Sequence, residues 1–187
     1  EWARGLIGSA ECLVREMAHL EATESELHAL IDAVPIDPGF ARFLRWLEPK
    51  RWPFYVVSDG FDFSIQRVFE RGNGNGLFRG GANIFANALR MEGRRAVVSF
   101  PNASPRCTHG CATCKAEIMR RLGRGRHPVI LIGDGLSDRY AVAEADIVFA
   151  KQQLLAYCRD HSIPCQPFET FDDVAEKLRE VIEKARV

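Results

Sequence analysis

The N-terminal quarter of the chain repeats apolar residues at helical spacing, which predicts three successive helices. The first lies within residues 2–20. The second begins after Thr23, because Thr23 and Glu26 have the spacing of a capping box, and it ends at Pro35. The third begins at Asp37 and Pro38, a pair typical of helix starts. The apolar faces consist of Leu6, Ile7, Ala10, Leu13, Val14, Met17 and Leu20, then Leu27, Leu30, Ile31 and Val34, then Phe40, Phe43, Leu44 and Leu47.

Beyond this region, short apolar runs alternate with helical stretches. Phe54–Val57 and Val129–Ile132 are apolar and rich in β-prone residues, as buried strands are. Two extended runs within residues 83–100 flank Glu92-Gly93 and predict a β-hairpin. Helical stretches are expected at residues 61–72, 115–122, 139–145 and from near residue 170 onward. This alternation predicts an α/β fold with a parallel sheet.

Composition narrows the class of protein. The chain has 187 residues, a formal net charge of zero and 47% hydrophobic residues, enough for one core or a core with a small cap. Zero net charge argues against nucleic-acid or membrane-surface binding, and the short basic cluster is expected to be a solvated helix end. That cluster is Arg120, Arg121, Arg124 and Arg126. Without a membrane-length apolar run or a signal peptide, we expect a cytoplasmic location and neither nucleic-acid nor membrane partners.

Two carboxylates follow the strand at Val129–Ile132. Asp134 and Asp138 lie in Gly-Asp-Gly-Leu-Ser-Asp, just past the carboxyl end of that strand. In open α/β sheets ligands bind at this edge, and close carboxylates suit Mg²⁺ together with a substrate phosphate. A solvated turn would have a similar composition.

A second candidate region follows the Phe54–Val57 strand. Ser58 precedes Asp59-Gly60 and a helical stretch, so its hydroxyl and the neighbouring amides can form a phosphate-binding corner, although ordinary turn chemistry is an alternative. Lys115 opens the helix that precedes the Asp134 strand. It can reach the same sheet edge, although most lysines are solvated surface residues.

These three motifs, in this order, resemble the haloacid dehalogenase superfamily of phosphatases. The resemblance implies a Rossmann-like core at residues 37–187, with a β-hairpin insertion, and a helical cap at residues 1–36. It also implies a magnesium-dependent phosphatase that acts on a small phosphorylated metabolite through an aspartyl-phosphate. Catalysis would use Ser58, Lys115 and Asp138, substrate binding would use Ser58, Asp59, Gly60 and Lys115, and Asp134 and Asp138 would hold Mg²⁺.

A closer resemblance is to the phosphoserine-phosphatase-like branch and, within it, to a phosphatase subfamily of methionine salvage. It covers nearly the whole chain, but it does not fix the substrate. The segments that carry it are Ser58-Asp59-Gly60-Phe61-Asp62-Phe63, Cys111-Ala112-Thr113-Cys114-Lys115, Phe149-Ala150-Lys151 with Leu154, Leu155 and Cys158, and Pro167-Phe168-Glu169-Thr170-Phe171.

One motif of the superfamily is absent. Its first strand ends in Asp-x-Asp-x-Thr, where the first Asp is the nucleophile, and these 187 residues contain no such motif. Either the chain is a fragment that lacks this strand, or it is a catalytically inactive relative that binds a phosphorylated ligand or a partner protein. We expect that the chain is a fragment, because the later motifs are intact. The sheet should then be interrupted beside the Asp134 strand.

Four soft ligands lie close together at Cys107, His109, Cys111 and Cys114. Zinc binds such residues tetrahedrally, but zinc sites usually combine two pairs separated by a longer spacer. We therefore expect free thiols or a local disulfide rather than zinc.

Overall fold

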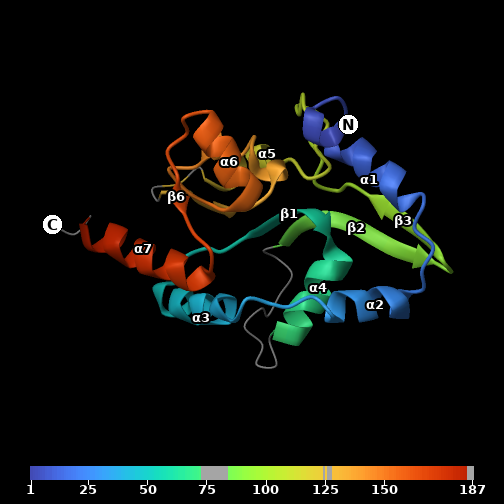
Figure 1. The fold of residues 1–187 in the computed structure, drawn as a ribbon, viewed down its shortest axis with the longest axis horizontal. Helices are drawn as coiled ribbons and strands as arrows, with labels where there is room; N and C mark the ends of the chain where they lie inside the picture. The colour runs from blue at the N-terminus through green and yellow to red at the C-terminus, as the bar shows by residue number, and fades with distance from the viewer. Residues whose placement is uncertain (73–83, 124, 126–127, 185–187) are drawn as a thin grey trace.

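The computed structural model describes residues 1–72, 84–123, 125 and 128–184, and in them it contains two three-stranded sheets (Figure 1). In the first sheet, β1 pairs in parallel with β2, and β2 forms the predicted antiparallel hairpin with β3. In the second sheet, β4, β5 and β6 are parallel. The strands are β1 Val56–Phe61, β2 Ile84–Glu92, β3 Arg95–Ser99, β4 Ile130–Gly133, β5 Ile147–Ala150 and β6 Gln166–Pro167. The predicted α/β class is confirmed.

The three N-terminal helices are confirmed, with their predicted caps. The Thr23 side chain and the Glu26 side chain form a reciprocal capping box at α2, and Asp37 accepts from the Gly39 amide at the start of α3. The α-helices are α1 Ser9–Met17, α2 Glu24–Asp32, α3 Pro38–Leu47, α4 Asp62–Gly72, α5 Lys115–Leu122, α6 Gln152–Asp160 and α7 Phe171–Lys184. Short 3-10 helices occupy η1 Trp2–Arg4, η2 Glu48–Lys50, η4 Leu136–Asp138 and η5 Val142–Glu144.

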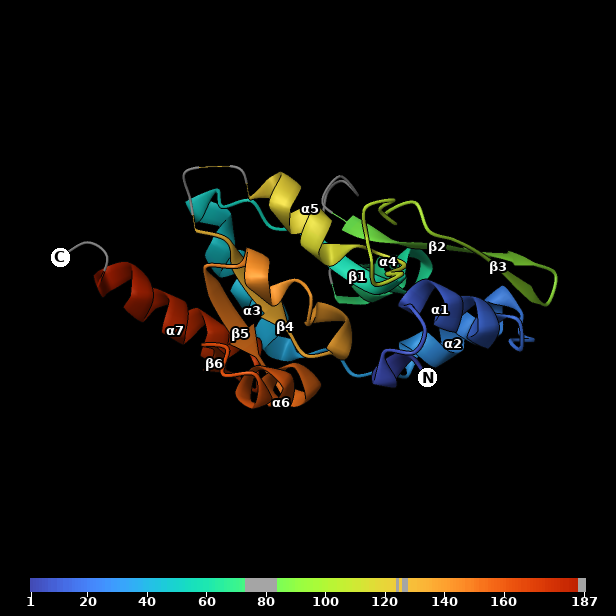
Figure 2. The same cartoon turned by 90° about the horizontal axis from the view of Figure 1, so that it is seen from above.

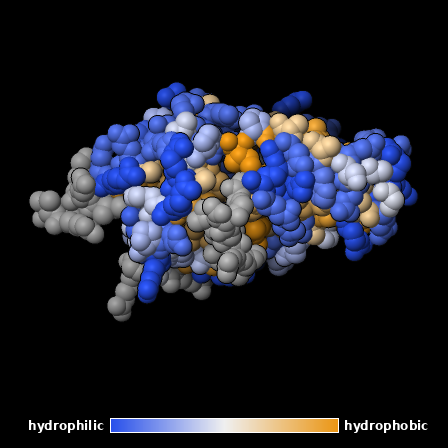
Figure 3. Space-filling view, turned by 90° about the horizontal axis from the view of Figure 1, so that it is seen from below, coloured by the Kyte–Doolittle hydropathy of each residue, from blue (hydrophilic) through white to orange (hydrophobic). Residues whose placement is uncertain are grey.

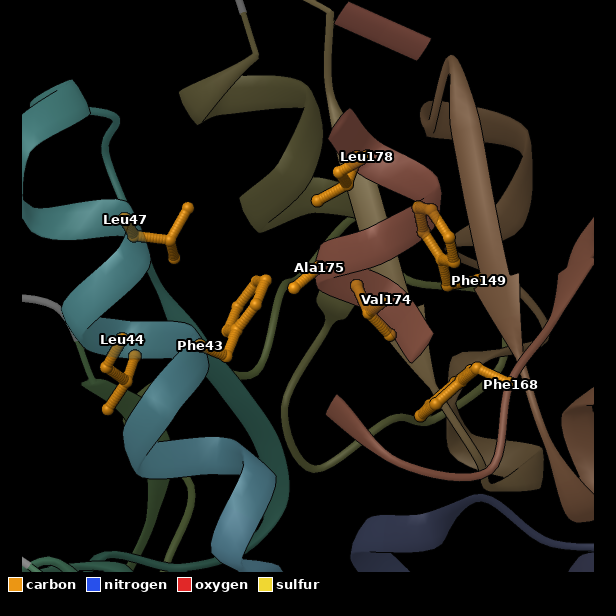
Figure 4. Close-up of a cluster of buried hydrophobic side chains, with 8 residues drawn as sticks. All are labelled: Phe43, Leu44, Leu47, Phe149, Phe168, Val174, Ala175 and Leu178. Carbon is orange, nitrogen blue, oxygen red and sulfur yellow. The ribbon is translucent and has the colours of Figure 1, made fainter. Parts of the chain in front are cut away.

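The β4–β6 sheet is covered by helices on both faces. Phe149 of β5 packs toward α3 and α7, whereas its neighbours Val148 and Ala150 pack against Leu154 and Cys158 of α6. Because side chains alternate along a strand, β5 contributes to both cores. Figure 4 shows the first of them, which consists of Phe43, Leu44, Leu47, Phe149, Phe168, Val174, Ala175 and Leu178.

The β1–β3 sheet lies in the other half of the molecule, with α1, α2 and α4 (Figure 2). The Arg67 guanidinium on α4 makes two hydrogen bonds to Asp32 of α2, at 2.8 and 2.6 Å. Arg71 also donates to the carbonyl of Ile31. The second helix is therefore tied to α4, and the boundary between cap and core near residue 36 stays a prediction.

The surface seen from below is mostly hydrophilic, and hydrophobic side chains gather near the middle of this face (Figure 3). No helix in the described ranges is long and apolar enough to cross a membrane.

The first strand differs from its prediction. It was expected at Phe54–Val57, with a helix from Phe61, but β1 starts at Val56 and continues to Phe61. Its register with β2 shifts between Val57 and Phe61, so the chain bulges there. Ser58, Asp59 and Gly60 therefore lie within an irregular part of the strand rather than beyond its end. The bulge depends on pairing with β2, a partner distant in sequence.

The helix expected at residues 139–145 is wrong. The segment follows the 3-10 helix η4, turns at residues 139–141, where the Ala141 amide donates to the Asp138 carbonyl, and forms the 3-10 helix η5. The connection must return to the start of β4, where the Asp146 amide donates to the Val129 carbonyl. A 3-10 helix rises about 2.0 Å per residue, against about 1.5 Å for an α-helix, so it spans this return with few residues.

The two sheets are separate. Among the described residues β4 pairs only with β5, and no backbone ladder joins β4 to β1. The interruption expected beside the Asp134 strand is confirmed.

Candidate active site

A buried ion pair lies beside the carboxyl end of β4. Lys115 Nζ donates to Asp138 Oδ1 at 2.5 Å and to Ser137 Oγ at 2.9 Å. Lys115 is 8% exposed and Asp138 is 6% exposed. A buried charge is stable only when it is paired and hydrogen-bonded, so each residue fixes the position of the other.

The sequence of α5 explains why Lys115 is buried. Lys115, Ile118 and Met119 are the buried residues of this helix, and their spacing places them on one face. As the first residue after the N-cap Cys114, Lys115 is at the end of that face nearest Ser137. The apolar residues on this face are buried, and the Lys115 ammonium group at its end reaches Asp138.

Asp138 is held on its other oxygen as well. Its Oδ2 accepts a hydrogen bond from the Gly135 amide at 3.2 Å. A Cβ atom on Gly133 would lie 2.6 Å from the same oxygen, so only glycine fits at the end of β4. The Gly-Asp-Gly sequence therefore lets the backbone approach the Asp138 carboxylate closely.

Asp134 differs from Asp138. It is exposed, and its carboxylate makes no hydrogen bond or ion pair with any residue the structure describes. Its main chain is fixed, because its carbonyl accepts from the Leu154 amide of α6 at 2.9 Å. Asp134 thus presents a free carboxylate at the strand edge, next to the buried ion pair.

The predicted phosphate corner at Ser58 lies in the β1 bulge. Ser58 Oγ accepts from the Gly60 amide at 3.0 Å, which closes a small turn. Asp59 Oδ1 accepts from the Thr113 amide at 2.8 Å, and the Asp59 carbonyl accepts from Asn87 at 2.7 Å. Asp59 was predicted to bind substrate, and in this position it anchors the loop before α5 to β1.

The structure thus brings Lys115 and Asp138 together, as the strand-edge argument predicted, and the Asp59–Thr113 hydrogen bond connects the Ser58 turn to the loop before Lys115. Sequence reasoning missed Ser137, Thr113 and Asn87. Thr113 and Asn87 are almost fully buried and hydrogen-bonded to each other at 3.0 Å. Ser137 could have been found, because it directly precedes Asp138 in the Gly-Asp-Gly-Leu-Ser-Asp segment.

A pocket of about 180 Å³ opens beside this cluster. Its lining includes Lys115 and Ser137 together with Cys107, Cys111 and Cys114 of the loop before α5. The remaining lining residues include His109 and Tyr140, whose rings stack with centroids 3.7 Å apart. The three cysteines and Lys115 of the buried ion pair therefore line the same pocket.

The three thiols of this loop affect one another's pKa. Burial opposes ionisation of Cys107, but hydrogen bonds from the amides of Cys111 and His109 and from the other two thiols lower its pKa below the ordinary value. Burial and the hydrogen bond to Cys107 raise the pKa of Cys111 to about 12, and the pKa of Cys114 is raised for the same two reasons. All six cysteines are free.

Metal-ligating side chains are sparse. Within the described ranges, no group of three or more His, Cys, Asp or Glu side chains is arranged to hold a metal ion. Asp134 and Asp138 form a pair of carboxylates only. This is the donor set that Mg²⁺ uses when a substrate phosphate completes its coordination.

Known proteins with similar sequences are phosphatases. A family model described as "Putative Phosphatase" matches residues 10–158. A 2-hydroxy-3-keto-5-methylthiopentenyl-1-phosphate phosphatase from Lysinibacillus sphaericus (strain C3-41) is 34% identical over 175 residues, which are 89% of this chain and 74% of that protein. The enzyme of the same name from Bacillus mycoides (strain KBAB4) is 31% identical over 155 residues, 82% of this chain and 68% of that protein.

Among solved structures, phosphoserine phosphatase from T. onnurineus, in complex with NDSB-201, aligns with a TM-score of 0.55 and 15% sequence identity. The alignment covers 84% of this chain and 66% of that one, so the chain spans just under two thirds of the solved protein. At this identity the likeness concerns the fold. Taken with the match over residues 10–158, it shows that the chain belongs to the family described as "Putative Phosphatase" and has the fold of the haloacid dehalogenase phosphatases.

Proposed function

We propose that this protein serves the magnesium-dependent hydrolysis of a phosphate monoester of a small metabolite. The observation that carries the proposal is the buried Lys115–Asp138 pair, with Ser137, at the carboxyl end of β4. A lysine this buried is rare, and a fixed ammonium at a ligand-binding sheet edge is suited to an anionic substrate. Family membership supports the reaction class.

Lys115 and Ser58 would act on the phosphoryl group. The Lys115 ammonium is already oriented by Asp138 and Ser137, so it would stabilise developing charge on phosphoryl oxygens without reorganising. The Ser58 hydroxyl accepts from the Gly60 amide and keeps its own proton, so it would donate a further hydrogen bond from the β1 bulge.

Mg²⁺ fits the two carboxylates in different ways. Asp134 is exposed and unpaired among the described residues, so it would ligate the ion directly. Asp138 has one oxygen on Lys115 and the other on the Gly135 amide, so we propose that it mainly orients Lys115 and a water near the ion. When bound, Mg²⁺ would neutralise part of the phosphate charge that repels an anionic nucleophile.

The nucleophile itself is proposed to come from outside these 187 residues. They contain no Asp-x-Asp-x-Thr, whereas the superfamily uses the first Asp of that motif to form an aspartyl-phosphate. Within the described part of the chain β1 and β4 do not pair, which supports a further strand between them. Asp59, which is held by the Thr113 amide, is a poor substitute.

The substrate class is a small phosphorylated metabolite. The two relatives described above are named for the phosphorylated compound 2-hydroxy-3-keto-5-methylthiopentenyl-1-phosphate, and the pocket of about 180 Å³ beside Lys115 suits a ligand of modest volume. We also propose a cytoplasmic location, in keeping with six free cysteines.

A second function is favoured by one observation, the absence of the nucleophile motif. The chain would then bind a phosphorylated ligand or a partner protein without hydrolysis. Assays of p-nitrophenyl phosphate hydrolysis with Mg²⁺ distinguish the two. We expect the 187-residue chain to hydrolyse the substrate no faster than buffer alone. A chain extended by a first strand with Asp-x-Asp-x-Thr should hydrolyse it catalytically. Strong activity from the 187 residues alone, or none from the extended and folded chain, would contradict the proposed mechanism.

A further inference from the structure

Ser58 and Lys115, the two side chains proposed to bind the phosphoryl group, belong to segments that are far apart in the sequence. Ser58 lies in the β1 bulge, and Lys115 is the first residue of α5. Groups that stabilise a transition state must already be in place when charge develops, so the two need a fixed separation. A buried hydrogen-bond network connects the two segments.

The network is a closed ring of three residues from β1, β2 and the loop before α5. Asn87 of β2 donates through Nδ2 to the Asp59 carbonyl at 2.7 Å, and its Oδ1 accepts from the Thr113 hydroxyl at 3.0 Å. The Thr113 amide completes the ring by donating to Asp59 Oδ1 at 2.8 Å. Asn87 is 0% exposed and Thr113 is 1% exposed, so water does not compete for these bonds.

The Asn87 side chain replaces a backbone partner that the β1 bulge lacks. Four steps along β1, from Val57 to Phe61, correspond to two steps along β2, which end at Asn87. In this described part of the chain, the β1–β2 register gives residues 58–60 no partner in β2. Asn87 binds the carbonyl in the middle of that stretch, directly after Ser58. It therefore holds the bulge that presents the Ser58 hydroxyl.

The same ring fixes the start of α5. Only Cys114 separates Thr113 from Lys115, and its φ of −78° and ψ of 83° form an inverse γ-turn in which the Lys115 amide donates to the Thr113 carbonyl at 2.9 Å. Thr113 is thus bound at its amide, its hydroxyl and its carbonyl. A displacement of Thr113 would move the first residue of α5, and with it the Lys115 side chain.

The chemistry of the ring allows Asn87 one orientation. The Asp59 carbonyl can only accept a hydrogen bond, so it requires the amide nitrogen, and the amide oxygen must face Thr113. The Thr113 hydroxyl can donate to that oxygen, whereas a valine side chain of the same shape cannot. Removing the hydroxyl therefore leaves the Asn87 oxygen buried without its donor and opens the ring.

We propose that Asn87 is a positioning residue that sets the separation between the Ser58 turn and Lys115, with Thr113 as its partner. The proposal rests on the proposed function, in which Ser58 and Lys115 bind the phosphoryl group. Asn87 is fully buried, so it acts through Asp59 and Thr113 and not by contact with the substrate.

Turnover of p-nitrophenyl phosphate by the chain extended with an Asp-x-Asp-x-Thr strand tests the proposal. Thr113→Val should lower kcat about 10–100-fold at a temperature where it is folded, because a misplacement of about 1 Å costs this much. Thr113→Ser, which keeps the hydroxyl, should turn over like wild type, and Asn87→Asp, which loses the donor to Asp59, should behave like Thr113→Val. The magnesium dependence should stay unchanged, because the main chain of Asp134 is held from α6.

Leu178→Ala is the matched control for lost stability. Leu178 is 2% exposed in the core that α3 and α7 share, so its truncation should lower the melting temperature without altering kcat. The proposal is overturned if Thr113→Val melts at a lower temperature but turns over like wild type. It is also overturned if Thr113→Ser or Leu178→Ala loses as much turnover as Thr113→Val.

A second measurement separates this proposal from the proposed hydrolysis. If the extended wild-type chain shows no turnover, hydrolysis is refuted, and the binding of inorganic phosphate to the 187-residue protein with Mg²⁺, measured by isothermal titration calorimetry, decides the positioning role. Weaker binding by Thr113→Val than by both Thr113→Ser and wild type would support that role. Equal binding by all three proteins, or no binding by wild type, would overturn it.

Discussion

Lys115 shows what a single residue can and cannot reveal in a sequence. On a predicted helix it could have been a solvated lysine, and its burial excludes that interpretation. The residue that decides its environment, Asp138, is 23 positions away, and only the return of the chain through β4 brings the two together. The strand-edge rule predicted that Lys115 and Asp138 lie together at the carboxyl end of β4. The hydrogen bond from Lys115 to Ser137, however, depends on local geometry that no motif encodes.

Replacing Lys115 by Met should destabilise the fold strongly, because the Asp138 carboxylate would remain buried without its partner. We expect a loss of about 3–5 kcal/mol in the free energy of unfolding, measured by urea denaturation. A matched control is Arg90→Met, which breaks an exposed pair with Glu92 and should cost at most about 1 kcal/mol. A Lys115→Met/Asp138→Leu double variant should recover much of the lost stability. If Lys115→Met alone unfolds at nearly the wild-type urea concentration, the buried pairing is contradicted.

The Cys111 thiol predicts a dependence of stability on alkaline pH. Its pKa is raised to about 12 in the folded protein by burial and by Cys107, so the folded state holds this proton more tightly than the unfolded state. The resulting stabilisation is complete below the ordinary thiol pKa and is lost as the pH rises toward about 12. Cys111→Ala should therefore flatten the decline in denaturant midpoint between neutral and strongly alkaline pH. An unchanged slope would place Cys111 in contact with solvent.

At the scale of elements, predictions succeeded where the signal is local. The capping box at Thr23, the Asp37 cap and the Glu92-Gly93 hairpin each depend on residues a few positions apart. Predictions failed where a distant partner decides. The β1 bulge follows its register with β2, and the 3-10 helices η4 and η5 follow the return toward Val129.

The end of β4 gives a sharp prediction for one element. A Cβ on Gly133 would lie 2.6 Å from Asp138 Oδ2 and 3.0 Å from Leu154, so Gly133→Ala should push the carboxylate away from Lys115. Overpacking of this kind typically costs about 1–3 kcal/mol, measurable by thermal denaturation. Gly135→Ala is the control, because its nearest neighbour is 3.8 Å away and its φ of −104° suits any residue. Equal stability of the two variants would argue against the close approach at Gly133.

At the scale of the whole molecule, the candidate site is an assembly of motifs from both halves. The order of Ser58, Lys115, Asp134 and Asp138 in the sequence indicated the superfamily, and the fold and family match agree with it. The sequence could not show which role each carboxylate has. Asp59 anchors the loop before α5 and Asp138 is held by Lys115, whereas Asp134, the third of these carboxylates, is exposed and has no partner among the described residues.

The central claim is that Lys115 acts on the phosphoryl group while Asp134 holds Mg²⁺. Steady-state hydrolysis by the chain extended with an Asp-x-Asp-x-Thr strand, measured against magnesium and substrate, tests it most directly. In folded protein, Lys115→Met should lose about 2–4 kcal/mol of transition-state stabilisation with unchanged magnesium dependence, and Lys115→Arg should keep the charge and the fold. Asp134→Asn should lose most of the rate and weaken the magnesium dependence. Wild-type turnover in Lys115→Met, or an unaltered magnesium response in Asp134→Asn, would contradict the account.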